Sequence, residues 1–195
     1  MQHKVKLTVI DKKLYSDLQK QYCADPNSGT CPCYNIGDEF IFERYGTADD
    51  FWHMGLNTLN QTANTADGIA GSYDFPHCSE AWDAISRYIY TGLQGGSIMR
   101  GWMNDERIMI ACCSDGTRPV IFKIERMDYK VLYIDGLNCE KCKSKIKNAL
   151  EKIDGVQQII FCEKYTEVYL DKDVDDETLK NSVESCGEYS VLKID

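Results

Sequence analysis

Alternation of apolar and polar residues predicts the strands of the N-terminal part of the chain. Three segments show this period, which is typical of half-buried strands: 4–11 (KVKLTVID), 38–44 (DEFIFER) and 118–126 (RPVIFKIER). The segment 107–113 (RIMIACC) precedes the turn sequence SDGT, so we expect it to form a hairpin with 118–126.

A helical period replaces the alternation in residues 79–96 (SEAWDAISRYIYTGLQGG). Trp82, Ile85, Ile89 and Leu93 fall on one face of the predicted helix. Ser79 is placed as the N-cap, and the glycine pair that closes the segment is a stop signal.

Residues 46–76 are rich in Asn, Thr, Ala and Gly. This stretch is too long for an ordinary connection, so we interpret it as an insertion or a lid.

The C-terminal part has the order strand, helix, strand, strand, helix, strand. These six predicted elements are 130–136, 139–155, 156–164, 166–173, 175–187 and 188–194. A split βαβ repeat of this kind predicts a ferredoxin-like sandwich. We therefore expect an α+β protein of two domains, 1–128 and 129–195, joined stiffly because only residues 127–130 separate the strands at the boundary.

Composition excludes several classes of function. The chain has 195 residues, ten cysteines and a formal net charge of -9, with no basic patch that would favour a nucleic-acid partner. No stretch approaches the roughly 20 apolar residues of a membrane helix, and the charged N-terminus does not resemble a signal peptide. We expect a cytoplasmic protein with reduced thiols that serve as metal ligands, reactive groups or buried side chains.

Cys139 and Cys142 form a Cys-x-x-Cys pair between a predicted strand and a predicted helix. A structural zinc site normally needs two such pairs, and the chain has only this one. A thioredoxin-type redox pair also lies at a helix start, but it belongs to a longer βαβ context. A two-thiolate clamp for a soft metal ion is the third interpretation.

Residues 129–195 resemble a heavy-metal-associated domain, the module of copper chaperones and of the N-terminal arms of copper-pumping ATPases. The family pattern Gly-Met-x-Cys-x-x-Cys is matched by Gly136, Leu137, Asn138, Cys139 and Cys142, with Leu137 in place of the usual Met. The resemblance implies that the two thiolates hold Cu(I) and that Leu137 packs beneath the loop.

The topology that the resemblance implies brings two further cysteines toward the same end of the domain. Cys186 lies in the last helix–strand loop, where family members often carry a residue that tunes the metal, and Cys162 lies near the top of the second strand. Burial as small apolar side chains is the alternative for both.

The N-terminal part is similar to a family of uncharacterised proteins from mainly anaerobic microbes. The matching segments are VKLTV, CP followed by GDEF, CSEAW and DGTRPVIFKIER. In that pattern the recurring cysteines fall at Cys31, Cys78 and Cys113. Three thiols are suited to a trigonal soft-metal site or to an iron–sulfur cluster with one open corner, and simple packing is the alternative.

The favoured function is soft-metal handling, in which Cys139 and Cys142 capture Cu(I) and pass it to thiols of the first domain. Alternatives are a metal-dependent or iron–sulfur-dependent redox or thiol enzyme, whose C-terminal domain loads or docks the metal, and a non-catalytic sensor or scaffold. The expected partners are a metal ion and another metal-transfer protein. The stiff join favours transfer to a second copy in a homodimer or to an outside partner.

Overall fold

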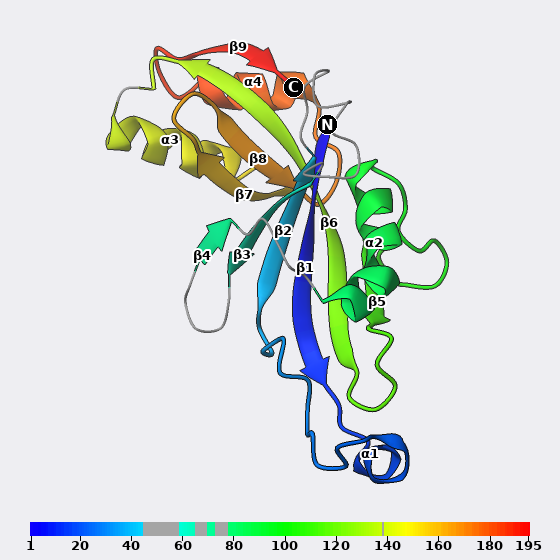
Figure 1. Cartoon of the computed structure of the whole chain (residues 1–195). Helices are drawn as coiled ribbons and strands as arrows, with labels where there is room; N and C mark the ends of the chain where they lie inside the picture. Colours follow the sequence, from blue (N-terminus) through cyan, green and yellow to red (C-terminus); the bar gives the residue numbers. More distant parts are fainter. Residues whose placement is uncertain (45–58, 65–69, 73–77, 138) are drawn as a thin grey trace, which may run out of the picture. The chain divides into compact units, whose positions relative to one another are not determined.

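The computed structural model describes residues 1–44, 59–64, 70–72, 78–137 and 139–195. The chain divides into two compact units (Figure 1). The N-terminal unit is Lys4–Arg126, and the C-terminal unit is Met127–Asp195 together with Met1–His3. Most of the predicted stretch 46–76 lies outside the described residues.

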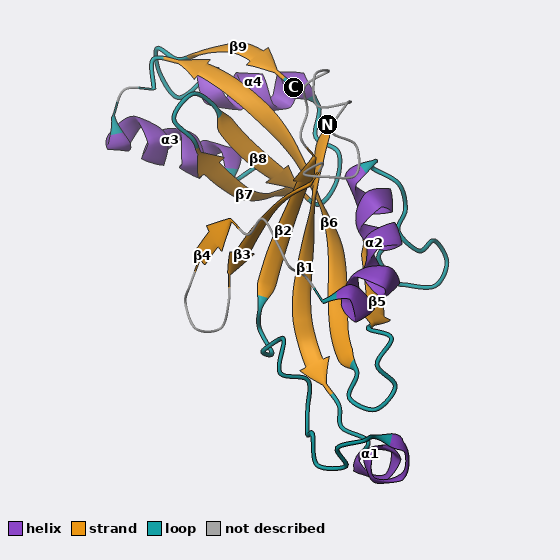
Figure 2. Cartoon of the chain, in the orientation of Figure 1, coloured by secondary structure: helices purple, strands orange, loops and turns teal. Residues whose placement is uncertain are grey.

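The N-terminal unit contains an antiparallel sheet (Figure 2). Its strands are β1 (Gln2–Lys12), β2 (Glu39–Arg44), β3 (Leu59–Asn64), β4 (Ala70–Ser72), β5 (Ile108–Cys112) and β6 (Val120–Asp135). The order is β4-β3-β2-β1-β6, and β5 also pairs with β6. The predicted hairpin of β5 and β6 is confirmed by the register that places Ala111 opposite Phe122.

Helix α2 (Ser79–Leu93) covers the core of the N-terminal unit. Ile85 and Ile89 on its apolar face are buried, as are Val120, Phe122 and Ile124 on alternate positions of β6. The helical and strand periods in the sequence therefore identified both sides of this core.

Four features of the N-terminal unit differ from the sequence-based expectations. Helix α1 (Ser16–Tyr22) has no strong apolar stripe and was not predicted. Strands β3 and β4 occupy part of a stretch that was expected to be an insertion or lid. Cys78, and not Ser79, is the N-cap residue of α2.

The fourth difference concerns the predicted boundary between the two strands near residues 127–130. The structure has one uninterrupted strand, β6, from Val120 to Asp135. No glycine or proline interrupts this segment, so extended backbone continues through the boundary between the units.

The C-terminal unit has the predicted βαββαβ order. After the second half of β6 come α3 (Glu140–Leu150), β7 (Val156–Phe161), β8 (Thr166–Leu170), α4 (Asp176–Glu184) and β9 (Ser190–Ile194). The strands pair antiparallel in the order β9-β6-β8-β7, which is the arrangement of a ferredoxin-like fold. Figures 1 and 2 show α3 and α4 beside these strands.

One apolar layer joins the helices of the C-terminal unit to its sheet. Ile146 and Leu150 of α3, Leu179 of α4, and Leu132 and Val168 of the strands are each 0% exposed. The i, i+4 spacing of Ile146 and Leu150 places both on the inner face of α3. Burying the apolar stripe orients the first turn of α3, where the cysteine pair lies.

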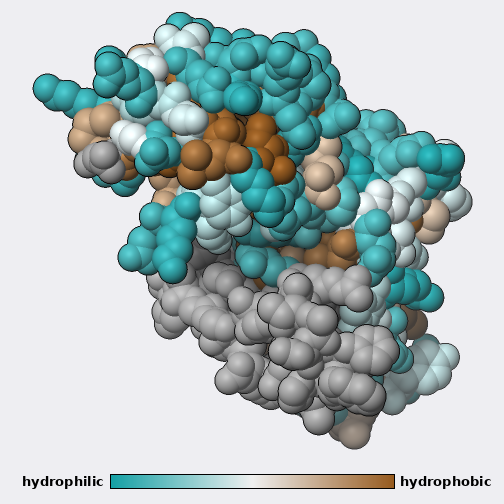
Figure 3. Space-filling view, turned by 90° about the horizontal axis from the view of Figure 1, so that it is seen from above, coloured by the Kyte–Doolittle hydropathy of each residue, from teal (hydrophilic) through white to brown (hydrophobic). Residues whose placement is uncertain are grey.

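The described residues contain no helix long and apolar enough to cross a lipid bilayer. On the face shown in Figure 3, hydrophilic residues cover most of the surface that the described residues form.

Candidate metal site

The loop between β6 and α3 makes a tight turn at Gly136. Gly136 has φ +85°, a left-handed conformation that side chains with a Cβ rarely adopt. A Cβ at this position would lie 2.8 Å from the carbonyl oxygen of Glu188, which belongs to the loop between α4 and β9. The glycine of the family pattern thus allows two loops of the C-terminal unit to approach each other.

The side chain of Leu137 anchors the same loop to the core of the C-terminal unit. It is half-buried and packs against the apolar core of the C-terminal unit. This is the packing role that the resemblance implied for the residue in the Met position. The next residue of the pattern, Asn138, lies outside the described residues.

Cys139 is the N-cap residue of α3. Its backbone is extended, and its sulfur accepts a hydrogen bond of 3.1 Å from the backbone N–H of Cys142. The two Cα atoms are 5.1 Å apart, and the structure joins the two sulfurs as a disulfide. Cys139 is exposed and Cys142 is half-buried, so the pair can be reached from solvent.

The start of a helix is a favourable position for anionic ligands. Backbone N–H groups that have no partner within the helix give the N-terminus a partial positive charge, which stabilises an anion there. Reduction of the disulfide therefore gives two adjacent thiols at a helix start, which can bind a metal ion as thiolates. Two soft ligands leave a bound soft metal ion open to attack by further thiolates.

Cys186 contacts α3 one helical turn beyond Cys142. Its thiol donates a hydrogen bond to the carbonyl oxygen of Ser182 at 3.2 Å and lies 3.9 Å from the carbonyl oxygen of Lys145. Cys162 lies in the turn after β7, where its N–H donates to the carbonyl oxygen of Tyr165. A role for either residue in metal binding stays a prediction.

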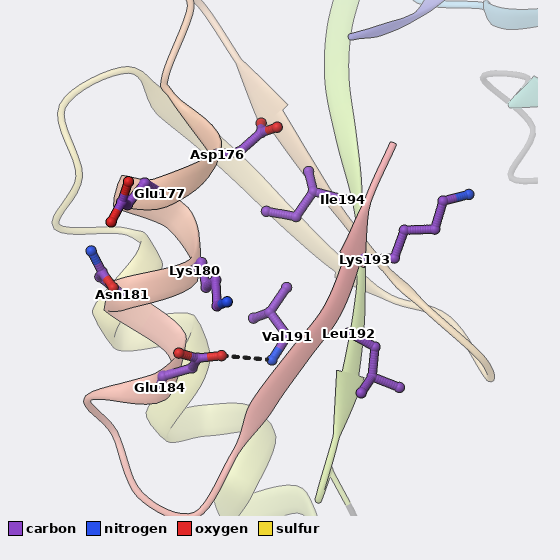
Figure 4. Close-up of a pocket in the computed structure, with 9 residues that line it drawn as sticks. All are labelled: Asp176, Glu177, Lys180, Asn181, Glu184, Val191, Leu192, Lys193 and Ile194. Carbon is purple, nitrogen blue, oxygen red and sulfur yellow. Dashed lines mark hydrogen bonds between the residues drawn. The ribbon is translucent and has the colours of Figure 1, made fainter.

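An open groove of about 550 Å³ lies between α4 and β9 (Figure 4). Across it, the carboxylate of Glu184 accepts a hydrogen bond of 3.1 Å from the backbone N–H of Val191. Its lining residues include no cysteine or histidine, so the groove offers no soft ligands. The contact instead fixes β9 against α4.

The three cysteines predicted as ligands in the N-terminal unit all border its apolar core. Cys113 is 8% exposed, and its sulfur accepts a hydrogen bond of 3.3 Å from the backbone N–H of Val120. Cys31 and Cys78 are half-buried and pack against the same core. Metal binding by these three residues stays a prediction.

The structure also places Cys33, which was not among the predicted ligands, beside two of them. Its thiol interacts electrostatically with Cys31 and Cys78. Burial raises the pKa of the Cys33 thiol, Cys31 and Cys78 raise it further, and Arg118 acts in the opposite direction. The Cys31-Pro32-Cys33 spacing in the sequence was the available signal for this pair.

Tyr34 links the cysteine-containing loop to the start of α2. Burial raises the pKa of the Tyr34 hydroxyl well above its usual range, and the nearby Cys78 raises it further. The ring also makes an edge contact with Phe122, with centroids 5.4 Å apart. These contacts connect the loop, the helix start and β6 within the N-terminal unit.

Among the described residues, no group of three or more Cys, His, Asp or Glu side chains is arranged to hold a metal ion. An iron–sulfur cluster takes four protein ligands in most proteins. An iron–sulfur cluster or a three-thiol site in the N-terminal unit stays a prediction.

A ferredoxin-like fold with a Cys-x-x-Cys pair at the start of its first helix defines a class of small metal-binding domains. Residues 131–188 match the model of the heavy-metal-associated domain, and the chain belongs to this family through its C-terminal unit.

Two relatives share this segment, both described as copper chaperone CopZ, from two strains of Staphylococcus epidermidis. Each is 31% identical over 64 residues, which make up 31% of this chain and 94% of the relative. The matched part is therefore almost the whole of each relative but a minor part of this chain. No solved structure matches the chain.

Proposed function

We propose that this protein captures Cu(I) between the thiolates of Cys139 and Cys142 and delivers it to thiols of its N-terminal unit. The observation that carries the proposal is the position of the pair, at an exposed helix start in a heavy-metal-associated domain. The similarity to two copper chaperones supports copper as the metal.

The chemistry of the ligands supports the same choice. Cu(I) is a soft ion that prefers thiolates, whereas Mg²⁺ and Ca²⁺ prefer oxygen ligands. Thiolate binding displaces protons, so the affinity for Cu(I) falls as the pH falls.

Delivery to the N-terminal unit is the second part of the proposal. Half-buried Cys31 and Cys78 and exposed Cys33 are among the soft ligands that an incoming Cu(I) ion would meet there. We propose that the ion passes between copies of the chain or through an outside partner. The short junction at residues 127–130 supports this route, because it contains no glycine, serine or proline of the kind that makes a long flexible linker.

A competition titration tests capture. The reduced full-length chain is titrated with Cu(I) against a chromophoric Cu(I) chelator, and Cys139→Ser/Cys142→Ser is compared with Cys112→Ser, which removes another exposed thiol, as the matched control. We expect the double variant to bind about one Cu(I) ion fewer than the wild type, because oxygen ligands bind Cu(I) poorly. Equal numbers of tightly bound Cu(I) ions in the wild type and the double variant contradict the proposal.

A thiol-redox enzyme is the second candidate function, favoured by the disulfide between Cys139 and Cys142 and by the contact between Cys31 and Cys33. Anaerobic purification followed by elemental analysis separates the candidates. Stoichiometric copper in a colourless protein supports metal handling, whereas a metal-free protein that cycles between dithiol and disulfide supports the enzyme.

A further inference from the structure

The loop between α1 and β2 is held on both sides of Cys31 and Cys33. On one side, the buried side chain of Gln19 donates to the carbonyl oxygen of Gly29 at 3.0 Å and accepts from its N–H at 3.2 Å. On the other side, the ammonium group of Lys12 donates to the carbonyl oxygen of Tyr34 at 2.6 Å. The two cysteines therefore lie on a short segment with fixed ends.

Proline restricts the backbone between these fixed ends. The ring of Pro32 fixes its own φ and disfavours helical backbone at Cys31. Within this restricted segment the Cys31 and Cys33 side chains, separated only by Pro32, interact electrostatically with each other. Two thiols that already lie together lose little conformational entropy when they bind one ion.

Cys31 and Cys33 are more accessible to solvent than Cys113 is. Cys33 is exposed and Cys31 is half-buried, whereas Cys113 is 8% exposed and its sulfur already accepts the N–H of Val120. The Cys113 sulfur is therefore shielded from an incoming ion and already accepts the hydrogen bond of a buried backbone group. The pair in the loop has no such competing contact with the backbone of β6.

A fixed cation stands beside the pair. The guanidinium of Arg118 is held by Asp115 at 3.0 Å and interacts electrostatically with both Cys31 and Cys33. Cu(I) bound by two thiolates carries a net negative charge, which a nearby guanidinium stabilises. The same arrangement would not favour a divalent hard cation.

We propose that Cys31 and Cys33 form a second two-thiolate site for Cu(I), with Arg118 as its counter-charge and Cys78 as the neighbouring thiol. This site is the acceptor for the delivery proposed above, and it rests on that proposal for the identity of the metal. It needs only two ligands, which agrees with the absence of any larger ligand group among the described residues.

The test is made in a Cys139→Ser/Cys142→Ser background, so that Cu(I) uptake by the full-length chain reports on the N-terminal unit. The reduced protein is titrated anaerobically against a Cu(I) chelator, without and with Cys33→Ser. Cys33 is exposed, so this change leaves the core intact. Cys112→Ser is the matched control, because Cys112 is an exposed thiol of the same unit.

We expect the background protein and its Cys112→Ser form to bind about one Cu(I) through two sulfur ligands, as measured by X-ray absorption. Cys33→Ser should lose this uptake. Equal uptake with and without Cys33→Ser overturns the inference, as does a spectrum with three or more sulfur ligands. Capture at Cys139 and Cys142 is decided separately, by comparing the wild type with the background protein.

Discussion

The ammonium group of Lys130 lies 2.6 Å from the carbonyl oxygen of Val174, although Lys130 is only 7% exposed. The same group lies 2.6 Å from a carboxylate oxygen of Asp176, in the first turn of α4. Lys130 thus ties β6 to the start of α4 and gives a buried backbone oxygen its hydrogen bond.

Replacement of Lys130 by Met should lower the free energy of unfolding. The carbonyl oxygen of Val174 loses its charged donor while remaining buried, which should cost about 1–3 kcal/mol. Urea denaturation measures the change. The control is Lys180→Met, at an exposed position on α4, and a loss of equal size there would contradict the explanation.

Replacement of Gly136 by Ala should destabilise the loop that carries Cys139. The left-handed backbone is unfavourable by about 1–2 kcal/mol for a residue with a Cβ, and the added atom would also press on the carbonyl oxygen of Glu188. Gly101→Ala is the control, because Gly101 has φ +75° but no atom within 4 Å of its added Cβ. Thermal unfolding should show a larger loss for Gly136→Ala.

The C-terminal unit could be predicted from the sequence because local pattern and tertiary packing agree there. Ile146 and Leu150 repeat with the helical period, and both are buried in the structure. Gly136 falls where the chain needs a left-handed residue. Each local signal pointed to the same fold, so the position of the Cys139–Cys142 pair followed from it.

The N-terminal unit was less predictable because long-range contacts determine its site. No feature of the sequence near Cys33 indicates an interaction with Arg118. The two residues are far apart in the sequence and interact only in the folded unit. From the sequence, Gln19 is expected to be a surface residue of a short helix. In the structure it is 1% exposed and hydrogen-bonded to the carbonyl oxygen of Gly29. Such contacts connect residues that no local period relates.

Asp105 should make stability depend on pH in the acid range. The Nη2 atom of the Arg107 guanidinium lies 2.8 Å from the Oδ2 atom of Asp105. This hydrogen bonding holds the pKa of Asp105 below its usual range. A lowered pKa in the folded state adds stability above the unfolded-state value of about 4, and the gain is lost as the pH falls through the folded-state value.

Asp105→Asn should therefore be less stable than the wild type at neutral pH, by up to about 1 kcal/mol for a half-exposed pair. The difference should shrink as the pH falls below about 4. Denaturation at a series of pH values measures it, with Asp83→Asn as the control at an exposed carboxylate of α2. A difference that is constant down to acid pH would show that the lost contact is not the ion pair.

Cu(I) should move between two copies of the chain when each carries one site. A Cys31→Ser/Cys33→Ser chain is loaded with Cu(I), mixed anaerobically with a tagged Cys139→Ser/Cys142→Ser chain, and separated for metal analysis. We expect copper on the tagged chain within minutes, because an exposed two-coordinate ion is open to attack by an incoming thiolate. A tagged chain that also carries Cys33→Ser should stay nearly free of copper. Equal loading of both tagged chains would mean that the ion moves to other thiols, and no loading of either would exclude transfer between copies.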